Sequence, residues 1–300
     1  MDTAESLRRA LKVTDELHSV VKTMKALAGV NIRQYEQAAR AVAEYTTTVE
    51  MGLQVALQRL PQHALPPKHA GGRKLGAVIF GSDQGMCGPL NDQVVSHAAL
   101  AMRRMAVKRV DQATIAVGVR AAAQMDNLAA SPESTVQVPG AIAGITGAVE
   151  EILHHVEEWH FKRGIEMVVL FYARPVSGGW YRVRGERLLP VDREWINGLR
   201  VKRWPGHTIP MFTMDETELF QALIREYLFA SLYRAFAESL ASENASRLAS
   251  MQVAETNIED RLRALTAESR QFRQTSITSE LLDIIAAYEA LRGKGKRITG

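Results

Sequence analysis

The sequence predicts a small α/β module between two long helices that pair with each other as an antiparallel coiled coil. The region from Asp215 to Arg292 contains neither glycine nor proline, whereas an ordinary globular helix has roughly 11–12 residues. Residues 1–60 repeat apolar side chains mostly at steps of three and four, which is the pattern of an amphipathic helix. Between them, apolar runs alternate with helical segments, which is typical of α/β folds.

The N-terminal helix is predicted from its apolar stripe. The stripe consists of Leu7, Leu11, Leu17, Val20, Val21, Met24, Leu27, Ala38, Val42, Tyr45, Val49, Leu53, Leu57 and Leu60. Gly29 and Gly52 interrupt this region, and each weakens a helix by about 1 kcal/mol relative to alanine. Several shorter helices packed as a bundle therefore remain the alternative.

The central module is predicted from short apolar runs and the breakers around them. A linker ends the first helix at Pro61, Pro66, Pro67, Gly71 and Gly72, because these residues disfavour helix. Strands are expected at 76–80, 114–119, 166–172 and 180–189. Helices are expected after a cap at Asn91 or Asp92, at 121–128 and at 145–162. This alternation predicts a mostly parallel sheet.

The C-terminal helix would span on the order of 115 Å if unbroken. A compact chain of this length has a radius of gyration of only roughly 19 Å, so the helix should protrude from the module and pair with the N-terminal one. Its own stripe is Leu248, Met251, Ala254, Ile258, Leu262 and Leu265. The predicted domains are therefore a helix at 1–60, a Rossmann-like module at 61–210 and a helix at 211–300.

Composition excludes several classes of protein. The 300 residues carry 37 basic and 33 acidic side chains, a net charge of +4, which argues against a nucleic-acid surface. Cys87 is the single cysteine, so no intramolecular disulfide is expected and a reducing compartment is natural. The first residues lack a basic region followed by an apolar run, so no secretory signal is expected. The longest apolar runs, 75–80 and 167–173, are far below the roughly 20 residues of a membrane helix, so any link to a membrane should run through another subunit.

Three constellations could indicate an enzyme, and none has the required pattern. The turn with Gly81, Gly85 and Gly88 lacks both the G-x-G-x-x-G fingerprint and the G-K-[ST] ending of a phosphate loop. Cys87 has no evident base close along the chain. His154, His155, Glu158 and His160 lack the H-E-x-x-H spacing of a zinc helix. We therefore predict no catalytic residue, cofactor or metal, and a nucleotide-binding α/β enzyme remains the alternative function.

Polar residues interrupt the apolar stripe of the C-terminal helix at 242–247 and 273–276. A static coiled-coil scaffold, the second alternative, would have regular heptads with apolar a and d positions. The interruptions break that regularity. They suit a helix surrounded by other proteins that it touches without binding tightly, as a moving part requires.

Four motifs carry a resemblance to a known family. They are Lys22-Thr23-Met24-Lys25-Ala26-Leu27-Ala28, the turn at 81–91 (GSDQGMCGPLN), the segment at 240–251 (LASENASRLASM) with 254–257 (AETN), and the segment at 273–281 (RQTSITSEL). Together the chain resembles the γ subunit of F-type ATP synthases over essentially its full length. The opening pattern of that family is largely missing at 10–17, which indicates a divergent branch.

The resemblance implies a central rotor shaft that couples c-ring rotation and ion translocation to ATP synthesis or hydrolysis at a ring of α and β subunits. The shaft would be non-catalytic, present in one copy per complex, and peripheral on the cytoplasmic face of a bacterial inner membrane. The implied partners are the α, β, ε and c-ring subunits, and the resemblance leaves proton or sodium transport open. The implied contacts to the α/β ring are Met24, Lys25, Glu243, Arg247, Arg273, Gln274 and Thr278, with Phe212 at the foot towards the c-ring.

Overall fold

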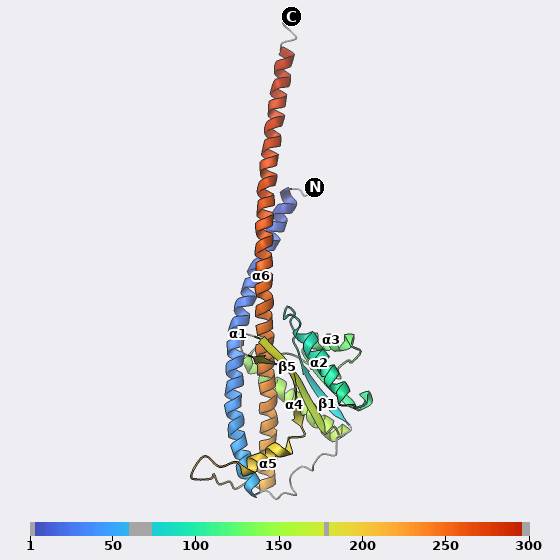
Figure 1. Ribbon diagram of the computed structural model, residues 1–300, viewed down its shortest axis with the longest axis vertical. Helices are drawn as coiled ribbons and strands as arrows, with labels where there is room; N and C mark the ends of the chain where they lie inside the picture. The colour runs from blue at the N-terminus through green and yellow to red at the C-terminus, as the bar shows by residue number, and fades with distance from the viewer. Residues whose placement is uncertain (1–3, 60–73, 177–179, 296–300) are drawn as a thin grey trace. The chain divides into compact units, whose positions relative to one another are not determined.

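The computed structural model describes residues 4–59, 74–176 and 180–295, and their contacts define two compact units. One unit comprises Met1–Ala26 and Met251–Gly300, and the other comprises Leu27–Ser250. Two long helices contribute to both units: α1 (Ala4–Arg59) and α6 (Glu216–Gly295) (Figure 1). Helix α1 continues through Gly29 and Gly52, so the alternative of several shorter helices is wrong.

Buried side chains of α1 recur at every seventh position. They are Leu7, Val21, Ala28, Tyr35, Val42, Val49 and Ala56, with Thr14 half-buried in the same series. A strict seven-residue repeat is typical of left-handed coiled coils. Within the predicted stripe, Ala38, Leu53 and Leu57 are buried as well, whereas Leu17, Val20, Leu27 and Tyr45 are exposed. Leu60 lies outside the described residues.

The two long helices run antiparallel in each unit. In the unit of the chain ends, Lys25 pairs with Glu255 and His18 lies opposite Glu259. In the other unit, the Asn31 amide donates to Asn244 and the Tyr45 hydroxyl to Glu226. As the residue number rises on α1 it falls on α6, which confirms the predicted pairing. The stripe at Leu248, Met251, Ala254, Ile258, Leu262 and Leu265 is buried or half-buried as predicted.

The module contains a five-stranded sheet in the order β3-β2-β1-β4-β5. Its strands are β1 (Leu75–Phe80), β2 (Gln112–Val117), β3 (Ser134–Val136), β4 (Met167–Val176) and β5 (Trp180–Leu189). All neighbouring pairs are parallel except β4 and β5. The mostly parallel sheet and four of its strands were predicted, and the short β3 was not.

Helices cover both faces of this sheet. Helices α4 (Ile145–Arg163) and α6 lie on one face, and α2 (Leu90–Arg104) and α3 (Val119–Asn127) lie on the other, whereas α5 (Arg193–Val201) packs against α1 and α6. Successive residues of a strand point to opposite faces, so Val78 and Phe80 of β1 belong to a core with α4 and α6, whereas Ala77 and Ile79 belong to a core with α2 and α3 (Figure 1). A third core joins α1, α5 and the start of α6.

The predicted cap of α2 is wrong. The helix begins at Leu90, directly after Pro89, and no side chain caps it. Asn91 is used elsewhere: its Oδ1 accepts from Ser82 N at 3.0 Å and its Nδ2 donates to Ser82 Oγ at 2.9 Å. The predicted linker residues Pro61, Pro66, Pro67, Gly71 and Gly72 lie outside the described residues. Among the helices described, none is long and apolar enough to cross a membrane.

Candidate functional site

In the turn after β1, a carboxylate of the protein occupies the place where an α/β enzyme would bind a phosphate. Ligands of open α/β sheets bind outside the carboxyl ends of the strands, and helix N-termini there attract phosphates. In this chain the Asp83 carboxylate takes that place: Oδ1 accepts from Val119 N, at the start of α3, and Oδ2 accepts from Val138 N, both at 2.8 Å. A nucleotide phosphate would therefore meet a carboxylate of the protein.

Cys87, in the same turn, is placed as a structural thiol. It is 2% exposed, and its Sγ lies 3.4 Å from Ser82 Oγ and 3.4 Å from Asn91 Nδ2. Among the described residues no histidine hydrogen-bonds to it. The arrangement offers no base that would activate this thiol.

Helix α6 packs its polar segment against this turn. Ser246 Oγ donates to Cys87 O at 2.6 Å, and an Arg247 nitrogen, Nη2, donates to Gln84 O at 3.4 Å. One turn earlier, Ser242 Oγ donates to Ala173 O at 3.0 Å. The polar residues at 242–247 thus interrupt the apolar stripe because they bond to the module. Our interpretation of this segment as an open, loosely touching surface is corrected by these contacts.

Gly88 supports this contact because it brings the turn close to α6. Its φ is +58°, and an added Cβ would lie 3.2 Å from the hydroxyl oxygens of Ser246 and Ser250. Gly88→Ala should lower the free energy of unfolding by about 1–2 kcal/mol through the left-handed backbone alone, with the close contact added. Gly164→Ala is the matched control, because its φ is +65° and nothing lies within 4 Å of an added Cβ. Urea unfolding of both variants gives their losses in the free energy of unfolding, and the difference is the contribution of the close contact with Ser246 and Ser250. Equal losses would contradict such a contribution.

Glu243 and Arg247 form a buried ion pair on this face of α6. Arg247 Nη2 lies 2.6 Å from Glu243 Oε1, and the residues are only 6% and 5% exposed. Burial raises the pKa of the Glu243 carboxyl, and the Arg247 guanidinium opposes that rise. The two side chains therefore stabilise each other inside the chain. Little of either is available to another protein, so their predicted contact with the ring is supported by the resemblance alone.

A second polar network joins α6 to the sheet. Glu186 of β5 accepts from the Tyr172 hydroxyl at 2.7 Å and from Arg234 Nη2 at 2.5 Å. Burial raises the pKa of Tyr172, and the Glu186 carboxylate adds to the rise. Glu238, one turn beyond Arg234, faces Arg174 at 3.4 Å. The module is therefore held to α6 by polar bonds at two levels as well as by apolar packing.

The remaining predicted contacts lie on different parts of the chain. Met24 and Lys25 are half-buried on α1, and Lys25 is bonded to Glu255. Phe212 is half-buried with the Arg59 guanidinium 4.9 Å from its ring centroid. Arg273, Gln274 and Thr278 are all exposed on α6, and the Thr278 hydroxyl donates to Gln274 O at 2.9 Å.

Helix α6 exposes a long run of side chains towards its C-terminal end. From residue 270 to residue 287 none is buried or half-buried. Large apolar side chains are among them: Phe272, Ile277, Leu281, Leu282, Ile284 and Ile285. An exposed apolar surface of this kind marks a protein contact. Our site prediction named only polar residues here, although the apolar side chains at helical spacing were a signal for the same surface.

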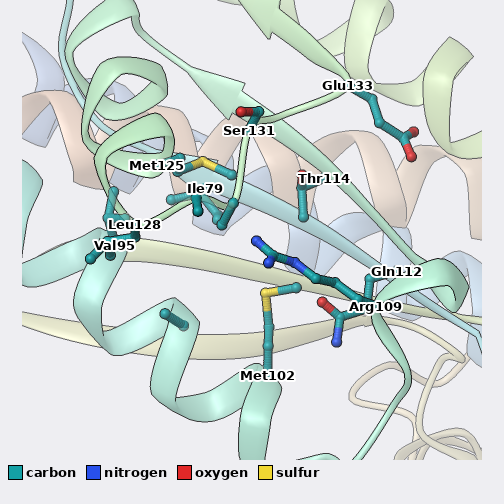
Figure 2. A pocket seen from close by; sticks show the side chains of 13 residues that line it. Ile79, Val95, Met102, Arg109, Gln112, Thr114, Met125, Leu128, Ser131 and Glu133 are labelled. Carbon is teal, nitrogen blue, oxygen red and sulfur yellow. The ribbon is translucent and has the colours of Figure 1, made fainter.

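The module also contains a cavity of about 390 Å³. Its apolar wall includes Ile79, Met102 and Met125, and the Arg109 side chain points into it (Figure 2). Gln112 and Thr114, at the start of β2, line it too. It therefore lies towards the amino ends of the strands, opposite to the edge where α/β enzymes bind nucleotides, and it does not favour the enzyme alternative.

A long antiparallel helical pair bonded to a small α/β module defines a shaft-type subunit. A family model described as "ATP synthase" matches residues 3–291, and the similar proteins are gamma chains. The chain belongs to the ATP synthase gamma family.

Relatives and solved structures agree over most of the chain. The ATP synthase gamma chain of Polynucleobacter necessarius subsp. necessarius (strain STIR1) is 26% identical over 97% of this chain and 100% of its own length. That of Thermobifida fusca (strain YX) is 23% identical over 95% of each. The same fold occurs in Euglena gracilis mitochondrial ATP synthase (OSCP/F1/c-ring; TM-score 0.66, 18% identity, 98% and 96% covered). It also occurs in the central stalk/c-ring structure from Tetrahymena thermophila mitochondrial ATP synthase (TM-score 0.56, 19% identity, 78% and 99% covered).

Proposed function

We propose that this chain is the central rotor shaft of an F-type ATP synthase or ATPase. The shaft couples c-ring rotation and ion translocation to ATP synthesis or hydrolysis at the α/β catalytic ring, and it is itself non-catalytic. The observation that carries the proposal is the 80-residue helix α6, which is bonded to the module at one end and exposes an apolar surface at 270–287. Membership of the gamma family supports the same role.

The shaft would act by differential contact with the ring. Because α1 has 56 residues and α6 has 80, and their sequences differ, the pair is asymmetric, and each rotary angle would favour one set of conformations of the three β sites. A conformational equilibrium shifts only when a partner interacts differently with the two states. We propose that the apolar surface at 270–287 makes such contacts, together with Met24, Lys25, Arg273, Gln274 and Thr278. For Glu243 and Arg247, which are buried, only the resemblance supports a contact with the ring.

We propose that the partners are the α, β, ε and c-ring subunits, with one copy of this chain per complex. The complex would lie on the cytoplasmic face of a bacterial inner membrane, and this chain would be peripheral to the membrane. Bacterial relatives of similar length support that location. Phe212 would lie at the foot near the c-ring. The functional division would follow residues 1–60, 61–210 and 211–300, supported by a sheet whose strands all fall between Leu75 and Leu189.

Met24→Lys is expected to reduce the number of ions pumped per ATP hydrolysed. Met24 is half-buried on α1, and a second ammonium beside Lys25 would add an unpaired charge at a moving contact, where desolvation of a charge is costly. The measurement is ion pumping and ATP hydrolysis by the purified complex in vesicles. Equal subunit composition in the variant and the wild type is the control. An unchanged ratio of pumping to hydrolysis would count against this contact.

Isolation of the chain from gently solubilised membranes tests the proposed function. Partner subunits are identified in the eluate, and its ATP hydrolysis is measured. Recovery of α, β, ε and c subunits with ATPase activity is the expected result. A chain recovered alone, or in a complex without an ATPase ring, would overturn the proposal and favour a static scaffold or an enzyme.

A further inference from the structure

We propose that His18, Glu255 and Glu259 form a binding site for a divalent cation of the zinc class, which joins α1 to α6. Each residue offers one ligand atom, and these three atoms all lie within 4.8 Å of one another. His18 comes from α1, and the two glutamates are one turn apart on α6. All three belong to the unit formed by the chain ends. The proposed rotor role does not require this site.

The His18 imidazole has a nitrogen that lacks a hydrogen-bond partner. His18 Nε2 is shielded from solvent and hydrogen-bonds to none of the residues that the structure describes. The nearest carboxylate oxygen, Glu259 Oε1, is 3.7 Å away, which is too long for a hydrogen bond. A cation between the two atoms would satisfy both, because zinc binds imidazole nitrogen and carboxylate oxygen at roughly 2.0–2.2 Å.

The donor set selects the class of metal. One imidazole and two carboxylates suit zinc, cobalt or nickel better than calcium, which prefers oxygen ligands alone. Three protein ligands leave a fourth position of a tetrahedral site open to water. Spacing at i and i+4 places both glutamates on one face of α6, so small side-chain rotations would bring their oxygens together.

Two neighbouring lysines limit the affinity and orient a ligand. The Lys25 ammonium bonds to Oε2 of Glu255, so Oε1 remains available to a metal. Such an outer-shell donor fixes the orientation of a ligating carboxylate. Lys22 also lies close enough to Glu255 to act on it electrostatically. Because both ammonium groups repel a dication, we expect weaker binding than at a cysteine site.

The site would stabilise a polar part of the helical seam. His18 and Lys25 occupy positions where a regular coiled coil would place apolar residues, and both lie seven-residue steps from Leu11. A metal bound by both helices would replace the missing apolar contact, since a ligand that binds only the folded state stabilises it. The sequence alone does not reveal the cluster, because its ligands come from opposite ends of the chain.

Titration of the full-length, metal-free chain with Zn²⁺ and Co²⁺ at neutral pH tests the site. We expect one Co²⁺ per chain with visible ligand-field absorption, and a higher temperature of helix unfolding with Zn²⁺. His18→Gln and Glu259→Gln should each weaken binding by about tenfold or more. His154→Gln, at an exposed histidine of α4, is the matched control and should bind as the wild type does.

The two ligand variants keep the test decisive if one of them folds poorly. Glu259 has a side chain that is 49% exposed, so its amide variant should retain the fold, which circular dichroism verifies. Wild-type affinity in either folded ligand variant would overturn the site. Loss of binding in His154→Gln would also overturn it, because the metal would then lie on α4.

Discussion

Arg247→Met is expected to lower the free energy of unfolding by about 3–5 kcal/mol, because it leaves a buried carboxylate without its partner. Glu243 is 5% exposed and Arg247 Nη2 lies 2.6 Å from its Oε1. Methionine preserves most of the side-chain volume but supplies no charge and no donor. Urea unfolding of the full chain, followed by intrinsic tryptophan fluorescence to which the buried Trp159 contributes, measures the loss.

The partner variant separates the ion pair from simple packing. Glu243→Gln removes the buried charge, so the double variant Glu243→Gln with Arg247→Met should be more stable than Arg247→Met alone. A double variant as unstable as the sum of the two single variants would mean that the pair does not couple, and would contradict the argument.

The loss in Arg247→Met should also depend on pH. Burial raises the pKa of Glu243 in the folded chain, and removal of Arg247 should raise it further. A carboxyl with a raised folded pKa binds its proton more strongly in the folded state, so its destabilising effect is greatest at high pH and is relieved as pH falls through the folded pKa. The difference from the wild type should therefore be smaller at about pH 5 than at about pH 8.

This ion pair lies at the contact between α6 and the module, which would transmit torque in the proposed rotor. Torque from the module would reach α6 through the bonds of Ser242, Ser246 and Arg247 and through the Glu186 network. Both levels join the helix to the sheet, one at the turn after β1 and the other at β4 and β5. The buried polar face of α6 is thus an internal connection between the helix and the module, whereas the exposed residues 270–287 form the surface that we propose for partners.

The long helices were predictable because their signal is local and repeated many times. The absence of glycine and proline from residues 215–292 predicted α6, and the repeat of apolar residues predicted α1. The strands β1, β2, β4 and β5 were predictable because each is a run of six or ten residues with strong apolar or alternating patterns. The three residues of β3, by contrast, are ordered by pairing with β2, and no local pattern in Ser-Thr-Val indicates that pairing.

The use of polar residues could not be predicted, because their partners are distant in the sequence. Asparagine often caps helices, yet the side-chain amide of Asn91 hydrogen-bonds to Ser82 instead. Arginine usually lies at the surface, yet Arg247 donates to the backbone carbonyl of Gln84 in the module, 163 residues away in the sequence. The sequence indicated that 242–247 was unusual. Only the three-dimensional contacts show that this segment bonds within its own chain.

Gly118→Ala is expected to be the most damaging small substitution in the module, with a loss of about 4 kcal/mol or more in the free energy of unfolding. Gly118 has a φ of +100°, and an added Cβ would lie 2.6 Å from the backbone carbonyl carbon and oxygen of Ser82. Backbone atoms cannot rotate away as a flexible side chain can. Relief would require breaking the bonds from Gly118 N to Val136 O and from Arg120 N to Ser82 O.

Gly85→Ala is the matched control, because it lies in the turn that Gly118 touches. An added Cβ there would meet only the Arg120 guanidinium at 3.7 Å, which is an ordinary contact, so its loss should stay within about 1 kcal/mol. Urea unfolding of both variants measures the difference. A Gly118 variant as stable as the Gly85 variant would show that the two turns can separate. That result would contradict our inference that the close contact between the turn after β1 and the turn after β2 holds Gln84 and Cys87 against α6.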